Sequence, residues 1–134
     1  MMEDCIFCKI SKGEAKSWKT YEDKNVMAFL SLNPSNDGHT LIAPKKHYED
    51  IYDIPENELK KIISVAKRLS QRYKEKLNVK ELNLLHASGK NAQQSVFHFH
   101  LHLVPRNKDD GIDLWHKDRE KIKLDFDEIL EKLK

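Results

Sequence analysis

Hydrophobic residues follow two different spacings along this chain of 134 residues. Short apolar runs with strand-like alternation predict five β-strands, at residues 17–22, 25–31, 39–43, 81–86 and 96–104. Pro44 and Pro105 are expected to end the third and the last of these strands, because proline cannot donate to a strand ladder. Between residues 55 and 78, apolar side chains recur at helical spacing and charged side chains fill the opposite face, which predicts one long helix. Residues 125–133 predict a shorter amphipathic helix.

The order of these elements predicts the fold class. Strands joined mostly by turns, with one long helix, lack the regular strand–helix alternation of a doubly wound fold. We therefore expect an α+β protein: a five-stranded antiparallel sheet with one long helix and a short C-terminal helix. The chain has the length of one domain and shows no linker or internal repeat, so residues 1–134 are predicted to form a single domain.

Charge and hydropathy exclude some classes of partner. The net charge is only +2. Charged residues make up 34% of the chain and mix both signs, without the basic stripe of a nucleic-acid-binding protein. Apolar runs are too short to span a membrane, and the start "MMEDCIFCKI" lacks the features of a signal peptide. These patterns predict a cytoplasmic protein that binds neither nucleic acid nor membrane.

Three histidines alternate with apolar residues in the stretch "SVFHFHLHLVPR". Successive side chains of a strand point to opposite faces, so His98, His100 and His102 would share one face. The residues between them would line the other face and fill the core: Phe97, Phe99, Leu101 and Leu103. The outer two histidines would lie roughly 13 Å apart along a regular strand, too far for one metal ion with bonds of about 2 Å. Either the histidines divide their roles, or they form a polar face without chemistry, where Thr, Lys and Glu would be more usual.

Imidazole chemistry suggests what such a division could achieve. Histidine can act as a nucleophile, as a general acid or base, and as a hydrogen-bond donor to phosphate. A central nucleophile beside a donor suits attack on phosphorus.

Near the N-terminus, Cys5 and Cys8 form a C-x-x-C pair, which in a reducing compartment favours a metal or redox role over a structural disulfide.

The stretch "HFHLHLV" resembles the signature of the histidine-triad (HIT) superfamily of nucleotide hydrolases and transferases. "DCIFCKISKGE", "YEDKNVMAFLSLNP" and "GHTLIAPKKHYED" occur in the order and spacing of its Hint-like bacterial and archaeal members, and the resemblance covers nearly the whole chain. It implies the HIT-like fold, a homodimer, and hydrolysis of purine nucleoside phosphoramidates or related nucleoside monophosphate derivatives. It also implies a covalent nucleotidyl-histidine intermediate.

The resemblance assigns roles to individual residues. It implies that His100 is the nucleophile, that His102 hydrogen-bonds the phosphate or the leaving group, and that His39 lines the same pocket. The remaining nucleotide-binding residues that it implies are Phe29 and Leu32 against the base, Ser31 at the ribose, and Gln94 and Ser95 at the phosphate.

A structural Zn²⁺ site is also implied by the resemblance, formed by Cys5, Cys8, His47 and His98. Two cysteines and two histidines are the composition of a closed structural zinc site, which would fix the N-terminal segment to the central strand. The alternatives are a pair of buried thiols, a redox C-x-x-C, or a catalytic or redox-active zinc. Two histidines receive plainer predictions: His86 as a packed or surface residue, and His116 as an exposed one.

Three positions depart from the pattern of the superfamily. Ser31 stands where an acidic residue commonly binds both ribose hydroxyls, and Ala87 stands where many members carry Asn or Gln near the reacting phosphate. Gln93 replaces a glycine, a residue that permits positive φ and close backbone approach. His86 or Lys90 are candidates to replace the lost polar contact. These departures keep two alternatives open: a nucleotide-binding or interaction module with little turnover, and a dinucleoside polyphosphate hydrolase.

Overall fold

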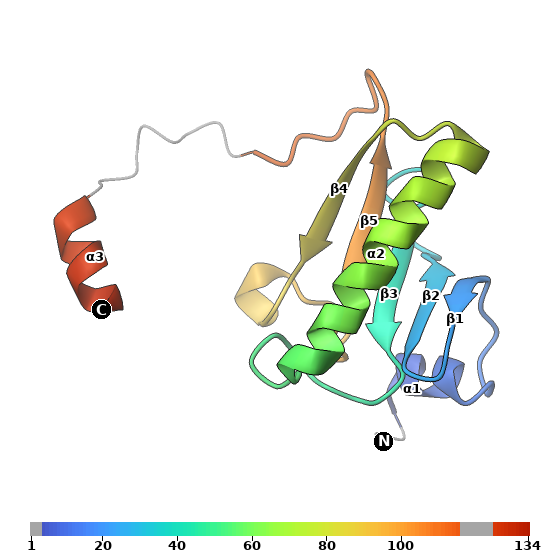
Figure 1. Cartoon of the computed structure of the whole chain (residues 1–134), viewed down its shortest axis with the longest axis horizontal. Helices are drawn as coiled ribbons and strands as arrows, with labels where there is room; N and C mark the ends of the chain where they lie inside the picture. The colour runs from blue at the N-terminus through green and yellow to red at the C-terminus, as the bar shows by residue number, and fades with distance from the viewer. Residues whose placement is uncertain (1–3, 116–124) are drawn as a thin grey trace.

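Five antiparallel strands form one sheet in the order β1-β2-β3-β5-β4 (Figure 1). The structure is a computed structural model that describes residues 4–115 and 125–134, so the prediction for His116 lies outside the described residues. The strands are β1 (Lys19–Glu22), β2 (Val26–Leu30), β3 (Thr40–Pro44), β4 (Glu81–His86) and β5 (Leu101–Arg106). The helices are α1 (Ile6–Ser11), α2 (Glu56–Leu77), the 3₁₀ turn η1 (Lys90–Ala92) and α3 (Phe126–Leu133). The predicted α+β class, with its five-stranded antiparallel sheet, is confirmed.

The sheet is covered on both faces near β2 and β3. The long helix α2 lies across one face, and the short helix α1 lies against the other (Figure 1). Alternate residues of β2 therefore enter two different cores: Val26 and Ala28 pack toward α2, whereas Met27 and Phe29 pack with Phe7 of α1. This double cover explains why the central strands have buried residues at consecutive positions rather than at every second one.

Helix α2 supplies most of the larger core. Its buried apolar residues are Ile62, Val65, Ala66, Leu69 and Tyr73, which pack against Phe99 and Leu103 from the histidine-rich stretch. The helical pattern is confirmed, but Ile63 and Leu77 are 51% and 58% exposed and lie off the buried face. Within the described residues, no helix is both long enough and apolar enough to cross a membrane.

The predicted last strand is wrong at both ends, because β5 begins at Leu101 rather than at residue 96 and continues through Pro105. The segment before Leu101 leaves the sheet to meet the loop after β3, where the amide of Phe99 donates to the carbonyl of Tyr48 at 2.6 Å. Phe97 consequently does not enter the core and is 45% exposed.

The two prolines lie inside their strands rather than after them. β3 pairs with β5 only from Thr40 to Ile42, so neither Pro44 nor Pro105 faces a partner strand on its nitrogen side. The carbonyl of a strand residue points to the same side as its nitrogen, and on this side each proline carbonyl accepts from a side chain. The carbonyl of Pro105 accepts from Asn36 Nδ2 at 3.0 Å, and the carbonyl of Pro44 accepts from His98 Nε2 at 2.7 Å. The missing N–H groups therefore cost no ladder hydrogen bond.

Candidate functional site

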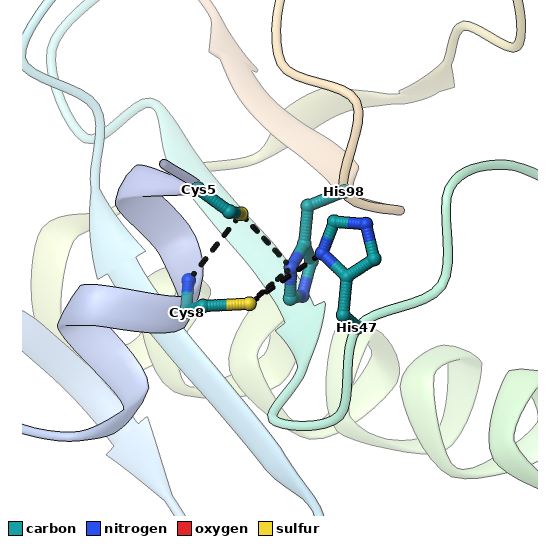
Figure 2. Close-up of side chains that lie close together, drawn as sticks. All are labelled: Cys5, Cys8, His47 and His98. Atoms are coloured by element: carbon teal, nitrogen blue, oxygen red, sulfur yellow. Dashed lines mark hydrogen bonds between the residues drawn. The ribbon is translucent and has the colours of Figure 1, made fainter. Parts of the chain in front are cut away.

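Four potential metal ligands from three separate parts of the chain meet beside α1 (Figure 2). Cys5 caps the N-terminus of α1 and Cys8 lies in its first turn, so the three-residue spacing places both thiols on one side of the helix. His47 comes from the loop after β3, and His98 comes from the segment before β5. All four ligand atoms lie within 4.8 Å of one another.

The spacing of these atoms fits a tetrahedral ion. The sulfur of Cys5 lies 3.4 Å from His98 Nδ1, and the sulfur of Cys8 lies 3.4 Å from His47 Nδ1 and 3.6 Å from His98 Nδ1. Bonds of about 2.3 Å to sulfur and about 2.0 Å to nitrogen would place a sulfur and a nitrogen ligand roughly 3.5 Å apart in a tetrahedral zinc site. The cluster can therefore hold a metal ion.

His98 is held in the form that a metal ion requires. Its Nε2 lies 2.7 Å from the carbonyl oxygen of Pro44, which can only accept, so Nε2 carries the hydrogen and Nδ1 presents a lone pair to the thiols. Burial is the main cause that lowers the pKa of His98 to about 4, so the ring is neutral near pH 7.

A cavity of about 620 Å³ lies on the α1 side of the sheet, next to this cluster. That volume suits a ligand of nucleotide size. It is lined by both predicted catalytic residues, His100 and His102, and by five of the predicted nucleotide-binding residues: Phe29, Ser31, Leu32, His39 and Ser95.

His100 is held as the tautomer that a nucleophile requires. Its Nδ1 lies 2.7 Å from the backbone carbonyl oxygen of His98, so Nδ1 carries the hydrogen and Nε2 keeps its lone pair. The ring is buried, and Phe7 packs edge-on against it with a centroid separation of 5.0 Å. Burial is also the main cause that lowers the pKa of His100, which favours the neutral, nucleophilic form.

A chain of hydrogen bonds fixes the tautomer of His102. The amide of Ser35 donates to His39 Nδ1 at 3.0 Å, so the neutral ring of His39 carries its hydrogen on Nε2. That Nε2 lies 2.9 Å from His102 Nδ1 and donates to it, which leaves the hydrogen of His102 on its Nε2. Burial, followed by the repulsion that protonated His100 and His39 would exert, lowers the pKa of His102 to about 4. The cavity thus presents a neutral acceptor, His100, beside a neutral donor, His102.

Gln94 does not line the cavity. It is buried, and its side chain accepts from the amide of Gly89 at 2.8 Å while donating to the carbonyls of Glu49 at 2.7 Å and Val96 at 3.1 Å. These three bonds use the amide group to hold the loop before β5. Its neighbour Gln93 lines the cavity instead.

The structure locates the other departures from the superfamily pattern. Gln93 adopts a left-handed conformation with φ of 68°, which a glycine would adopt without strain. Neither His86 nor Lys90, the two proposed replacements for a contact at Ala87, belongs to the residues that line the cavity. His86 Nδ1 instead donates to the carbonyl of His100 at 2.9 Å, so His86 is a packed residue, one of the two alternatives that the sequence left open.

Sequence reasoning missed α1 and the residues that it brings to the cavity. Ile6 and Ile10, four positions apart on this helix, line the cavity together with Phe7. The apolar spacing in "CIFCKI" carried this signal, but a helix of six residues is too short for periodicity to predict. Lys16 was also missed, because nothing in the local pattern distinguishes it from a surface lysine.

The sheet, the four-ligand cluster and the histidine-lined cavity together define a histidine-triad protein. A family model described as the HIT domain matches residues 12–109. The chain is 42% identical to an uncharacterised HIT-like protein of Methanocaldococcus jannaschii, over 97% of this chain and 98% of the relative. It is 43% identical to adenosine 5'-monophosphoramidase HNT1 of Saccharomyces cerevisiae, over 76% and 62% respectively. It is 35% identical to adenylylsulfatase HINT3 of Arabidopsis thaliana, over 93% and 64%.

Solved structures agree with this assignment. A HIT family protein from Bacillus anthracis matches with a TM-score of 0.85 at 36% identity, over 99% of this chain and 94% of that one. A Zn-bound histidine triad family protein from Mycobacterium smegmatis matches with a TM-score of 0.79 at 37% identity, over 88% and 86%. The chain belongs to the HIT family.

Proposed function

We propose that this protein hydrolyses purine nucleoside phosphoramidates or related nucleoside monophosphate derivatives through a nucleotidyl intermediate on His100. The observation that carries the proposal is the hydrogen bond from His100 Nδ1 to the carbonyl of His98, which leaves a lone pair on a buried Nε2 at the cavity. The names of the relatives from yeast and Arabidopsis support the substrate class, since one is a phosphoramidase and the other an adenylylsulfatase.

In the first step His100 Nε2 attacks the α-phosphorus, and the bond from phosphorus to the leaving group breaks. An anionic phosphoryl group in the cavity favours the protonated form of His102, because an opposite charge raises the pKa of a histidine. Nε2 of His102 then transfers a proton to the departing nitrogen. In the second step water attacks phosphorus, the bond to His100 breaks, and a proton from the water returns to His102.

The cavity wall suits a nucleoside. Phe29 and Leu32 line the cavity with the apolar residues of α1, and we propose that they pack against the base. Ser95 adds a hydroxyl to the cavity lining near the phosphate end, whereas the backbone amide of Gln94 already donates to the carbonyl of Gly89 at 3.1 Å. The buried Gln94 side chain shapes this loop rather than binding ligand.

We propose that the cluster of Cys5, Cys8, His47 and His98 binds a structural Zn²⁺. Two thiolates and two imidazoles at tetrahedral spacing support this choice, as does the Zn-bound relative from Mycobacterium smegmatis. The ion would join α1 to the segment before β5, and four protein ligands leave no open position for a catalytic water. A reducing compartment keeps such thiols from forming a disulfide, so we propose a cytoplasmic location.

We also propose a homodimer. Strand β4 lies at an edge of the sheet, and Leu84 on it is 38% exposed. Helix α3 carries exposed apolar side chains, among them Phe126 and Leu133, that a second copy can cover.

The kinetic test compares the wild type with His100→Ala on an adenosine phosphoramidate and on a dinucleoside polyphosphate. The proposal expects wild-type turnover of the phosphoramidate and a loss of at least about 10³-fold in the variant. Equal rates for the two proteins contradict the assignment of the nucleophile. Faster turnover of the polyphosphate supports the alternative hydrolase, and nucleotide binding without any turnover supports a binding module, which Ser31, Ala87 and Gln93 keep open.

A further inference from the structure

One wall of the cavity is built by the segment before β1. The amide of Leu30 donates to the carbonyl of Trp18 at 2.9 Å, which continues the pairing of Lys19 with Phe29 beyond the end of β1. The same register places Ser17 opposite Ser31, and Lys16 opposite the residue that follows Ser31. Lys16, Ser17 and Ser31 all line the cavity.

Lys16 and Ser17 lie far from the reacting histidines, whereas Ser31, which follows β2, lies nearer to them. The amide of Ser31 donates to the carbonyl of His39 at 2.9 Å, and His39 contacts His102. In the sheet order, β2 and β3 separate the β1 side from β5, on which His102 lies. Three strand spacings of about 4.8 Å place the two sides roughly 14 Å apart. A ligand whose phosphorus lies at His100 would therefore pass Ser31 with its ribose and direct its far side toward Lys16 and Ser17.

The charge of this wall is positive. Among the described residues that line the cavity, Lys16 is the only one with a permanent charge, and none is an aspartate or a glutamate. The ammonium of Lys16 lies 4.8 Å from the centroid of the Trp18 ring, at the distance of a cation–π contact. The hydroxyl oxygen of Ser31 accepts from the amide of Asn33 at 3.2 Å, so its own hydrogen can be donated to a ligand.

An ammonium with two hydroxyls suits an anion better than a pair of ribose hydroxyls, for which a carboxylate is the stronger acceptor. We propose that the cavity selects nucleotides that carry a second phosphate, on the 2′ or 3′ oxygen of the ribose, and that Lys16, Ser17 and Ser31 bind it. This inference rests on the proposed function, because it places the reacting phosphorus at His100. The protein would then act on 5′-phosphoryl derivatives of ribose-phosphorylated nucleosides.

Calorimetric titration of the full chain tests the inference without relying on turnover. The ligands are AMP, adenosine 2′,5′-bisphosphate and adenosine 3′,5′-bisphosphate, and the readout is the ratio of their Kd values. We expect one bisphosphate to bind about tenfold more tightly than AMP, with a preference that decreases as salt is raised. Lys16→Gln and Ser31→Asp should each remove most of this preference. Lys24→Gln, which removes the same charge from an exposed lysine outside the cavity lining, should preserve it.

The outcomes separate this inference from the function on which it rests. Equal affinity for AMP and both bisphosphates overturns the inference and leaves the proposed function standing. Failure of all three ligands to bind overturns both. A preference that persists in Lys16→Gln overturns the role of the wall, and the relative affinity of the two bisphosphates identifies the ribose oxygen.

Discussion

The Nδ1 atom of His100 lies 2.7 Å from the backbone carbonyl oxygen of His98 and donates a hydrogen bond to it. His98 at the same time directs its own Nδ1 toward the thiols of Cys5 and Cys8. The residue that would bind the metal therefore also fixes the tautomer of the proposed nucleophile through its main chain. The metal centre and the active site share one residue and use different atoms of it.

Removal of the metal is predicted to affect both stability and activity. Without the ion, two thiolates and two imidazoles lose their common partner, and α1 loses its link to the segment before β5. We expect chelation to lower the free energy of unfolding by about 3 kcal/mol or more, with a fall in Tm of about 10 °C. Scanning calorimetry with and without chelator measures this, and added Zn²⁺ should restore Tm and turnover together. An unchanged Tm contradicts the assignment of the cluster.

His102→Ala is predicted to slow turnover by an amount that depends on the leaving group. A departing amine needs a proton, whereas sulfate leaves readily as an anion, so only the first should depend strongly on His102. We expect a loss of about 10²- to 10⁴-fold in kcat on an adenosine phosphoramidate and a much smaller loss on adenylyl sulfate. A loss of equal size on both substrates would show that His102 binds phosphate without transferring a proton.

Acid is predicted to destabilise the fold through its buried histidines. Burial lowers the pKa of His102 to about 4, from an ordinary value of 6.5, so the unfolded chain binds more protons than the folded one between these values. Stability from this group is therefore complete above about pH 6.5 and is lost as the pH falls toward 4. His39, whose pKa is also lowered by burial, adds to the same trend.

The measurement is the free energy of unfolding between pH 7.5 and 4.5 for the wild type and His102→Asn. Metal-free protein is used, so that protons do not compete with an ion for His47 and His98. The variant should show a shallower loss of stability, because asparagine does not titrate. Parallel curves would mean that His102 keeps an ordinary pKa in the fold.

Gln93→Gly is predicted to stabilise the loop before β5. Gln93 has φ of 68°, and a side chain in this left-handed region costs about 1 kcal/mol relative to glycine. We expect a net gain of about 0.5 kcal/mol in urea unfolding, because the larger backbone entropy of glycine in the unfolded chain offsets about half of the relieved strain. Ala92→Gly is the matched control, since Ala92 lies in η1 outside the positive-φ region and should lose about that amount. Stabilisation by both substitutions would contradict the prediction that the positive φ of Gln93 is the source of strain.

The sequence predicted the elements whose patterns span many residues. Strands β1 to β4 and helix α2 appear within about two residues of their expected bounds, because alternation and helical spacing reflect which side chains are buried. The start of β5 could not be predicted in this way. Local alternation continues through Phe97, but the amide of Phe99 pairs with Tyr48, and the side chain of His98 with Pro44, both distant in sequence.

In the candidate site, too, the sequence predicted some features, whereas others depend on contacts that only the fold determines. The identities of the histidines and cysteines were available from motifs, and the structure brings the four predicted metal ligands together. The tautomers of His100 and His102 depend on carbonyl and amide groups whose positions only the fold determines. For Gln94 the resemblance implied a phosphate contact, whereas its three side-chain hydrogen bonds to the loop, two of them to Glu49 and Gly89, give it a structural role.

The most direct test of the account is to trap the intermediate. Wild-type protein is mixed with an adenosine phosphoramidate, quenched rapidly without acid, digested and analysed by mass spectrometry. The account predicts an adenylyl group on His100, present during turnover and absent in His100→Ala. An adenylyl group on another residue, or steady turnover by the wild type with no adduct at early times, would contradict it.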